Sequence, residues 1–164
     1  MTDFTTFMPL ALEQAKKAAT RGEVPVGAVI VLNGMLLASA GNRTRELNDP
    51  TAHAEILAIR DACSKLGVDR LTDASIYVTL EPCPMCAAAI SNARIAKLFY
   101  GANDNKSGGV CQGPRIFSHP QCHHKPDIYD GISEVECVLL LHEFFKGKRP
   151  VSYTHLTLPT TAIV

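Results

Sequence analysis

Two short segments of the sequence carry residue types that bind zinc. Residues 53–55 read His-Ala-Glu where an apolar helix is expected to begin, and residues 82–86 read Pro-Cys-Pro-Met-Cys before an alanine-rich helix. A catalytic zinc takes three protein ligands, commonly imidazole and thiolate, and leaves its fourth position to water. His53, Cys83 and Cys86 supply three such ligands, so the pattern predicts a catalytic zinc site.

A lone Cys-x-x-Cys pair also fits two other kinds of site. It could be a redox pair or half of a structural zinc ribbon. The sequence holds no second Cys-x-x-Cys to complete a ribbon. Both thiols also stand at the expected opening of a helix, where free backbone N–H groups favour negative charge and lower a thiol pKa. These features favour the zinc interpretation.

Glu55 is the candidate general acid and base. It lies two residues after the histidine ligand, and a zinc with a complete ligand set has no structural need for a neighbouring carboxylate. The alternative is a solvated helix glutamate with no role. The adjacent zinc pattern favours the catalytic role.

The elements that position these residues can be read from hydrophobic spacing and turn signals. Helical patterns cover residues 4–20, 51–66, 84–93 and 133–148, and Gly67 is expected to close the second helix. Strands are expected over residues 26–32, 35–39, 75–80, 97–101 and 127–129, with Asn33-Gly34 as a hairpin turn. This order predicts a layered α/β domain whose sheet mixes an antiparallel hairpin with parallel βα units.

Composition narrows the class of protein. The 164 residues are 46% hydrophobic and 20% charged, which suits one globular domain. No apolar run reaches the ~18 residues that would span a membrane, and no signal peptide is recognisable. Six cysteines without a secretory signal suggest reduced thiols or metal ligands, and therefore the cytoplasm.

The charge is balanced overall but not locally. Sixteen basic residues match sixteen acidic ones, yet residues 91–126 hold five basic residues against one aspartate. The segment from residue 103 to 126 is also rich in glycine, proline and histidine, and long loops of this kind are more often functional than idle.

The C-terminal residues 150–164 differ from the rest of the chain. They contain no Asp, Glu, Lys or Arg, and residues 152–160 are similar to a translated sequencing-adaptor read-through. An ordinary flexible tail is the alternative. We therefore predict a functional domain over residues 1–149 followed by a non-native or disordered tail over 150–164.

Together the motifs resemble the zinc-dependent cytidine and deoxycytidylate deaminase superfamily, whose signature is His-x-Glu followed by Pro-Cys-x-x-Cys. Further segments are similar to its bacterial tRNA-specific adenosine deaminase branch, namely residues 23–28, 42–43, 49–55, 77–83 and 144–145. The resemblance covers roughly residues 4–149. It implies a cytidine-deaminase-like three-layer α/β domain with a mixed central sheet of about five strands, one Zn²⁺ per subunit and a homodimer.

The resemblance implies hydrolytic deamination of adenosine to inosine at the wobble position of a tRNA anticodon. A zinc-activated water would attack the adenine, and Glu55 would transfer the proton. One alternative is deamination of a free base or nucleotide such as guanine, cytosine or CMP. A second, from another class, is a non-catalytic zinc-stabilised RNA-binding module.

The resemblance also suggests residues that contact the tRNA anticodon stem-loop. Asn42 would bind the extruded base, Pro25 and Val26 would wall its pocket, and Asp104 would lie beside the sugar. Contacts further along the RNA would come from Lys106, His124, Lys125, Phe145 and Arg149. Each has a plain structural alternative: a turn residue, a strand start, a surface loop, or an aromatic ring that only packs.

Overall fold

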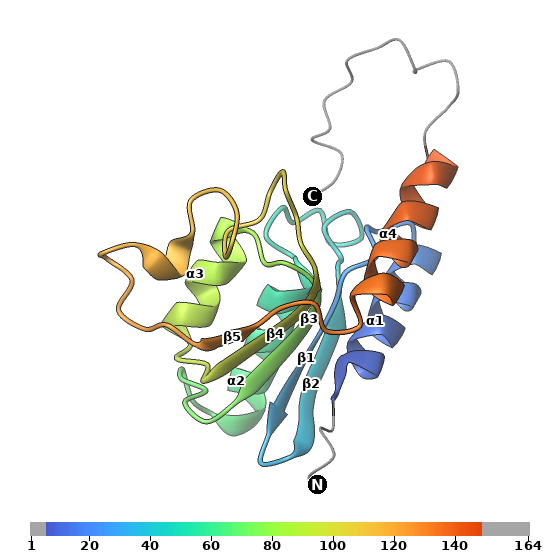
Figure 1. Ribbon diagram of the computed structural model, residues 1–164. Coiled ribbons are helices and arrows are strands. Elements are labelled where there is room, and N and C mark those ends of the chain that lie inside the picture. Colours follow the sequence, from blue (N-terminus) through green and yellow to red (C-terminus); the bar gives the residue numbers. More distant parts are fainter. Residues whose placement is uncertain (1–5, 149–164) are drawn as a thin grey trace, which may run out of the picture.

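The computed structural model describes residues 6–148. Within this range the chain forms four α-helices, five strands and one short 3₁₀ helix (Figure 1). The helices are α1 (Met8–Thr20), α2 (Ala54–Leu66), α3 (Pro84–Asn92) and α4 (Glu134–Lys148), with the 3₁₀ helix η1 at Ile116–Ser118. The strands are β1 (Gly27–Leu32), β2 (Met35–Gly41), β3 (Ser75–Leu80), β4 (Lys97–Ala102) and β5 (Asp127–Tyr129).

The five strands form one mixed sheet in the order β2-β1-β3-β4-β5. The β1 strand pairs antiparallel with β2 and with β3, whereas β3, β4 and β5 run parallel. The predicted mixed sheet of about five strands is confirmed.

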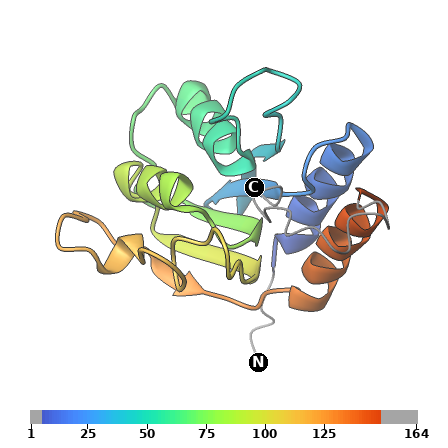
Figure 2. The same ribbon diagram turned by 90° about the horizontal axis from the view of Figure 1, so that it is seen from above.

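Helices cover both faces of this sheet and make three layers (Figure 2). On one face α1 packs against β1, β2 and β3, while α4 packs against β4 and contacts α1. On the other face α2 packs against β1 and β2 and contacts α3. The helices that carry the predicted zinc ligands therefore share one layer.

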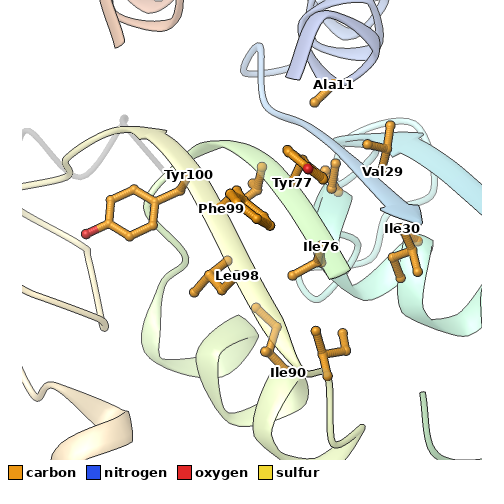
Figure 3. Close-up of a cluster of buried hydrophobic side chains, with 14 of the residues drawn as sticks. Ala11, Val29, Ile30, Ile76, Tyr77, Ile90, Leu98, Phe99 and Tyr100 are labelled. Carbon is orange, nitrogen blue, oxygen red and sulfur yellow. The ribbon is translucent and has the colours of Figure 1, made fainter. Parts of the chain in front are cut away.

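Buried side chains pack on both faces of the sheet (Figure 3). Toward α1, Tyr77 stacks on Phe99 with ring centroids 4.4 Å apart, and Phe99 stacks on Tyr129. Toward α3, the buried residues Ile76 and Leu98 pack beside Ile90 (Figure 3). Burial of such side chains stabilises the sheet that carries the site.

Two helices begin three or four residues later than the sequence predicts. A helix starting at residue 4 would place Pro9 in its interior, where the ring clashes with an upstream carbonyl, and α1 accordingly begins at Met8. The helix expected from residue 51 begins at Ala54, because Asp49 accepts hydrogen bonds from the Thr51 N–H (2.9 Å) and hydroxyl (2.7 Å) and holds a turn there.

The turn chemistry is as expected. Asn33 and Gly34 both have positive φ (52° and 74°), as a tight hairpin requires, and Gly67 ends α2 in the left-handed conformation. The 3₁₀ helix in the long loop was not predicted. Among the described helices, none combines the length and the apolar character that a membrane span requires. The predicted tail over residues 150–164 lies outside the described residues.

The backbone of α1 approaches β1 so closely at Gly27 that one added methyl group should destabilise the fold. A Cβ at Gly27 would overlap the Ala11 carbonyl oxygen and lie 2.6 Å from the Ala15 nitrogen, both backbone atoms of α1. We expect Gly27→Ala to lower the free energy of unfolding by about 3 kcal/mol or more, measured by urea denaturation. Gly147→Ala is the control, because its Cβ meets nothing within 4 Å. Equal stability of the two variants would contradict the packing described here.

Candidate metal centre

Three side chains that are distant in sequence meet where α2 and α3 begin. His53 is the N-cap of α2, Cys83 is the N-cap of α3, and Cys86 lies in the first turn of α3. Both N-cap residues have extended backbone, and Pro84 occupies the first helical position, where its missing N–H is not needed. The two helix starts therefore direct imidazole and thiol groups to one point.

The spacing of these groups fits zinc. The His53 Nδ1 atom lies 3.6 Å from the Cys83 Sγ and 3.5 Å from the Cys86 Sγ, and all three ligand atoms lie within 4.8 Å of one another. Tetrahedral zinc with bonds of about 2.3 Å to sulfur and 2.0–2.1 Å to nitrogen separates those ligands by roughly 3.6 Å. The three ligand atoms therefore lie at separations that suit three corners of a zinc tetrahedron.

The pKa values of the two thiols are shifted in opposite directions. A hydrogen bond from Cys86 lowers the pKa of Cys83 to about 4, and the same bond, together with burial, raises the pKa of Cys86. Metal ligation requires thiolates, so zinc binding would release the thiol protons. The backbone N–H groups at the start of α3 favour the resulting negative charge.

Glu55 lies beside the ligands without belonging to their cluster. It is the second residue of α2, is 3% exposed, and lines the same pocket as His53 and Cys83. Burial, and after it the negative charge of Cys83, raises the pKa of Glu55 to about 7. A buried carboxyl of this kind, close to the ligands, is suited to hold and release a proton.

Several of the predicted substrate-binding residues line a pocket next to the ligands. Its lining consists of Val26, Asn42, His53, Glu55, Leu80, Glu81, Cys83 and Asp104. The Asn42 Oδ1 atom accepts a hydrogen bond from the Ala54 N–H (2.8 Å), which caps α2 and fixes the carboxamide. Pro25 is buried and is absent from the described lining, so its expected place in the pocket wall is not observed, whereas that of Val26 is.

The other predicted RNA contacts lie outside this pocket. Lys106 and Lys125 are exposed on the long loop, and the His124 ring makes a 2.7 Å hydrogen bond with the Ile95 carbonyl. Phe145 is half-buried and meets the neighbouring phenylalanine edge-on. Arg149 lies outside the described residues. All these RNA contacts stay predictions.

Two buried glutamates hold the loops around the pocket, and the partners of these carboxylates were not predicted from the sequence. Glu23 accepts hydrogen bonds from the Arg45 and Glu46 N–H groups, and Glu81 accepts four from the loop after β4. The available signal was a charged residue inside an apolar stretch, since a buried charge requires partners.

Substitution of one cysteine ligand, compared with substitution of a cysteine outside the site, tests the zinc assignment. We expect Cys86→Ala to bind fewer than about 0.1 zinc per chain and to unfold at lower temperature, because only three protein ligands hold the metal. Cys63→Ala, at a half-buried position on α2 outside the cluster, should keep one zinc per chain. Metal analysis and thermal denaturation measure both. Retention of full zinc by Cys86→Ala would remove it from the ligand set.

Comparisons with known proteins agree with this site. The model of the cytidine and deoxycytidylate deaminase zinc-binding region matches residues 1–102. The chain is 59% identical over 149 residues to a tRNA-specific adenosine deaminase of Agrobacterium fabrum, covering 91% of this chain and 98% of the relative. It is 42% identical to a tRNA-specific adenosine deaminase of Bacillus subtilis, covering 91% and 92%.

Solved structures show the same fold. One, from a study of A-to-I editing by tRNA:A34 deaminases at the wobble position, has a TM-score of 0.82 and 61% identity, covering 82% of this chain and 98% of that chain. A guanine deaminase from Bacillus subtilis has a TM-score of 0.58 and 43% identity, covering 62% and 66%. The expected cytidine-deaminase-like fold is confirmed. With its three-ligand zinc site and these matches, the chain belongs to the cytidine and deoxycytidylate deaminase family.

Proposed function

We propose that this chain is a zinc-dependent hydrolase that deaminates adenosine to inosine at the wobble position of a tRNA anticodon. The observation that carries the proposal is the buried Glu55 carboxyl in one pocket with the zinc ligands. The relatives named tRNA-specific adenosine deaminase, at up to 59% identity, support the substrate. The reaction cleaves an exocyclic C–N bond with water.

The residues of the site have different roles in the proposed reaction. His53, Cys83 and Cys86 would hold zinc, which when bound lowers the pKa of water and so supplies a nucleophile at neutral pH. Glu55 would take one proton from water and deliver it to the ring nitrogen, where inosine retains it, and would then carry the second water proton to the amino group, which leaves as ammonia. Because the Asn42 Oδ1 atom is engaged by α2, its amide offers N–H donors, which suit the acceptor nitrogens of a purine.

A free base or nucleotide is the rival substrate, and the similarity to a guanine deaminase is the observation that favours it. The exposed cations Lys106, Arg115 and Lys125 on the loop between β4 and β5 favour RNA, because a free base needs no phosphate contacts. The discriminating experiment compares an anticodon stem-loop bearing adenosine at the wobble position with free guanine, cytidine and adenosine. We expect inosine from the stem-loop and little ammonia from the free compounds.

A non-catalytic RNA-binding module is less consistent with the site. Pure binding has no use for a carboxyl that is 3% exposed beside the metal ligands. A buried carboxyl whose pKa is raised, in a pocket lined by metal ligands, is typical of a chemical role. Product formation by the zinc-loaded chain distinguishes the two classes.

We further propose that the enzyme is a homodimer and acts in the cytoplasm. Ala88 and Ala89 on α3 remain partly exposed although Ala87 and Ile90 are buried, so a second helix could approach α3 closely. The cytoplasm supplies transfer RNA and keeps thiols reduced, as zinc ligation by two cysteines requires.

Glu55 variants should separate chemistry from binding. We expect Glu55→Ala and the isosteric Glu55→Gln to lower kcat by about 10²–10⁴-fold, because both remove the proton carrier. Zinc content and stem-loop affinity should stay within about twofold, since Glu55 is not among the ligands. Steady-state kinetics, metal analysis and equilibrium binding measure the three quantities. Substantial activity in either variant would contradict the assigned role.

The C-terminal end allows a second test. We expect truncation after Arg149 to leave stem-loop kinetics unchanged, because residues 150–164 carry no charged side chain. Truncation after His142 removes Phe145 and the cations beyond it. It should raise KM for the stem-loop and flatten its salt dependence while zinc is retained. Kinetics at two salt concentrations measure this. If the shorter deletion is as damaging as the longer one, the tail belongs to the binding surface.

A further inference from the structure

Glu81 is a buried carboxylate that binds one loop through backbone groups alone. It follows β3, is 2% exposed, and stands two residues before the ligand Cys83. Its Oε1 atom accepts a hydrogen bond from the Asp104 N–H (3.1 Å). Its Oε2 atom accepts three more, at 2.9–3.1 Å, from Val110, Cys111 and Gln112.

The same loop is seated directly on the segment that carries the zinc ligands. The Gly109 N–H donates to the Pro82 carbonyl (2.8 Å), and a Cβ at Gly109 would lie 2.6 Å from the Pro84 nitrogen. A Cβ at Gly108 would lie 2.6 Å from the Glu81 Oε2 atom. Both glycines therefore permit a backbone approach that no other residue allows without displacement.

Asp104 is the loop residue that this arrangement presents to the pocket. It is 6% exposed and lines the pocket with Asn42 and Glu55. Its Oδ1 atom accepts hydrogen bonds from the Lys106 and Ser107 N–H groups, which fold the turn that follows. Its own N–H is held by Glu81, so the position of Asp104 depends on that carboxylate.

We propose that Glu81 is a positioning residue that fixes Asp104 and the backbone of residues 108–112 relative to the zinc ligands. Glu81 lines the pocket, but both its oxygens are engaged by N–H donors, so it acts through the loop and not on the reacting atoms. This role deepens the proposed function and rests on it where substrate binding is concerned. The loop geometry itself does not depend on the substrate.

The four N–H donors around Glu81 make Glu81→Gln a selective test of this role. Four N–H groups converge on two oxygens, and a carboxamide has only one oxygen, with N–H donors in place of the other. In Glu81→Gln the oxygen can satisfy the three donors of residues 110–112, and the NH₂ group then faces the Asp104 N–H. The variant should therefore release Asp104 selectively and leave the rest of the loop attached.

Amide hydrogen exchange of the full-length, zinc-loaded protein tests this directly. We expect exchange at the Asp104 amide to accelerate about tenfold or more in Glu81→Gln, because an unpaired buried donor replaces a hydrogen bond. Exchange in α2 should not change. Glu23→Gln is the matched comparison, since Glu23 is equally buried but holds residues 45 and 46, and acceleration should be confined to one of those two amides. The exposed Glu136→Gln on α4 controls for loss of charge.

Kinetics on the anticodon stem-loop supply the second readout. Glu81→Gln should raise KM about tenfold with kcat within about twofold and one zinc per chain, because the metal ligands and Glu55 are untouched. If Glu81→Gln does not fold, Glu81→Asp replaces it: the shorter side chain keeps the charge but cannot span both anchor points, and the same local acceleration is expected.

Two results would overturn the proposal. One is an Asp104 amide that exchanges as slowly in the variants as in the unmodified protein. The other is a kcat that falls while KM is unchanged, which would make Glu81 part of the chemistry. Absence of inosine from the unmodified protein would instead contradict the proposed function, and the exchange result would still decide the role of Glu81 in the loop.

Discussion

The molecule depends on bringing the first turns of two helices together on one face of the sheet. The α2 helix follows the β1–β2 hairpin and α3 follows β3, and β1 lies between β2 and β3 in the sheet. Their N-cap residues, His53 and Cys83, then place nitrogen and sulfur 3.6 Å apart. A shift of one residue at either helix start would rotate its ligand away by about 100°, so the capping turns set the geometry of the metal site.

Buried carboxylates near the metal site are tolerated where backbone N–H groups donate hydrogen bonds to them. Glu23 and Glu81 accept several N–H bonds each, and every buried side-chain nitrogen or oxygen of the described residues has a partner. Glu55 differs, since burial dominates its environment and raises its pKa to about 7. Glu23, Glu81 and Asp104 thereby build loops, and the proposed mechanism assigns proton transfer to the fourth buried carboxyl, Glu55.

Local patterns were sufficient for much of the fold and for the ligands. The strands Ser75–Leu80 and Asp127–Tyr129 have the predicted bounds, and the Asn33-Gly34 hairpin and the Gly67 helix end follow from backbone conformations that few residues adopt. The loop partners of Glu23 and Glu81 could not be predicted in this way. Their partners are backbone N–H groups more than twenty residues away, and any residue except proline supplies such a group.

We propose that the His53, Cys83 and Cys86 site hydrolyses the wobble adenosine with water. Incubation of the zinc-loaded chain with an anticodon stem-loop in H₂¹⁸O, followed by mass spectrometry of the nucleosides, measures this reaction. We expect inosine at the wobble position alone, carrying one ¹⁸O atom from solvent, and none after chelation of the metal. Unchanged adenosine in the stem-loop together with efficient release of ammonia from free guanine would contradict it.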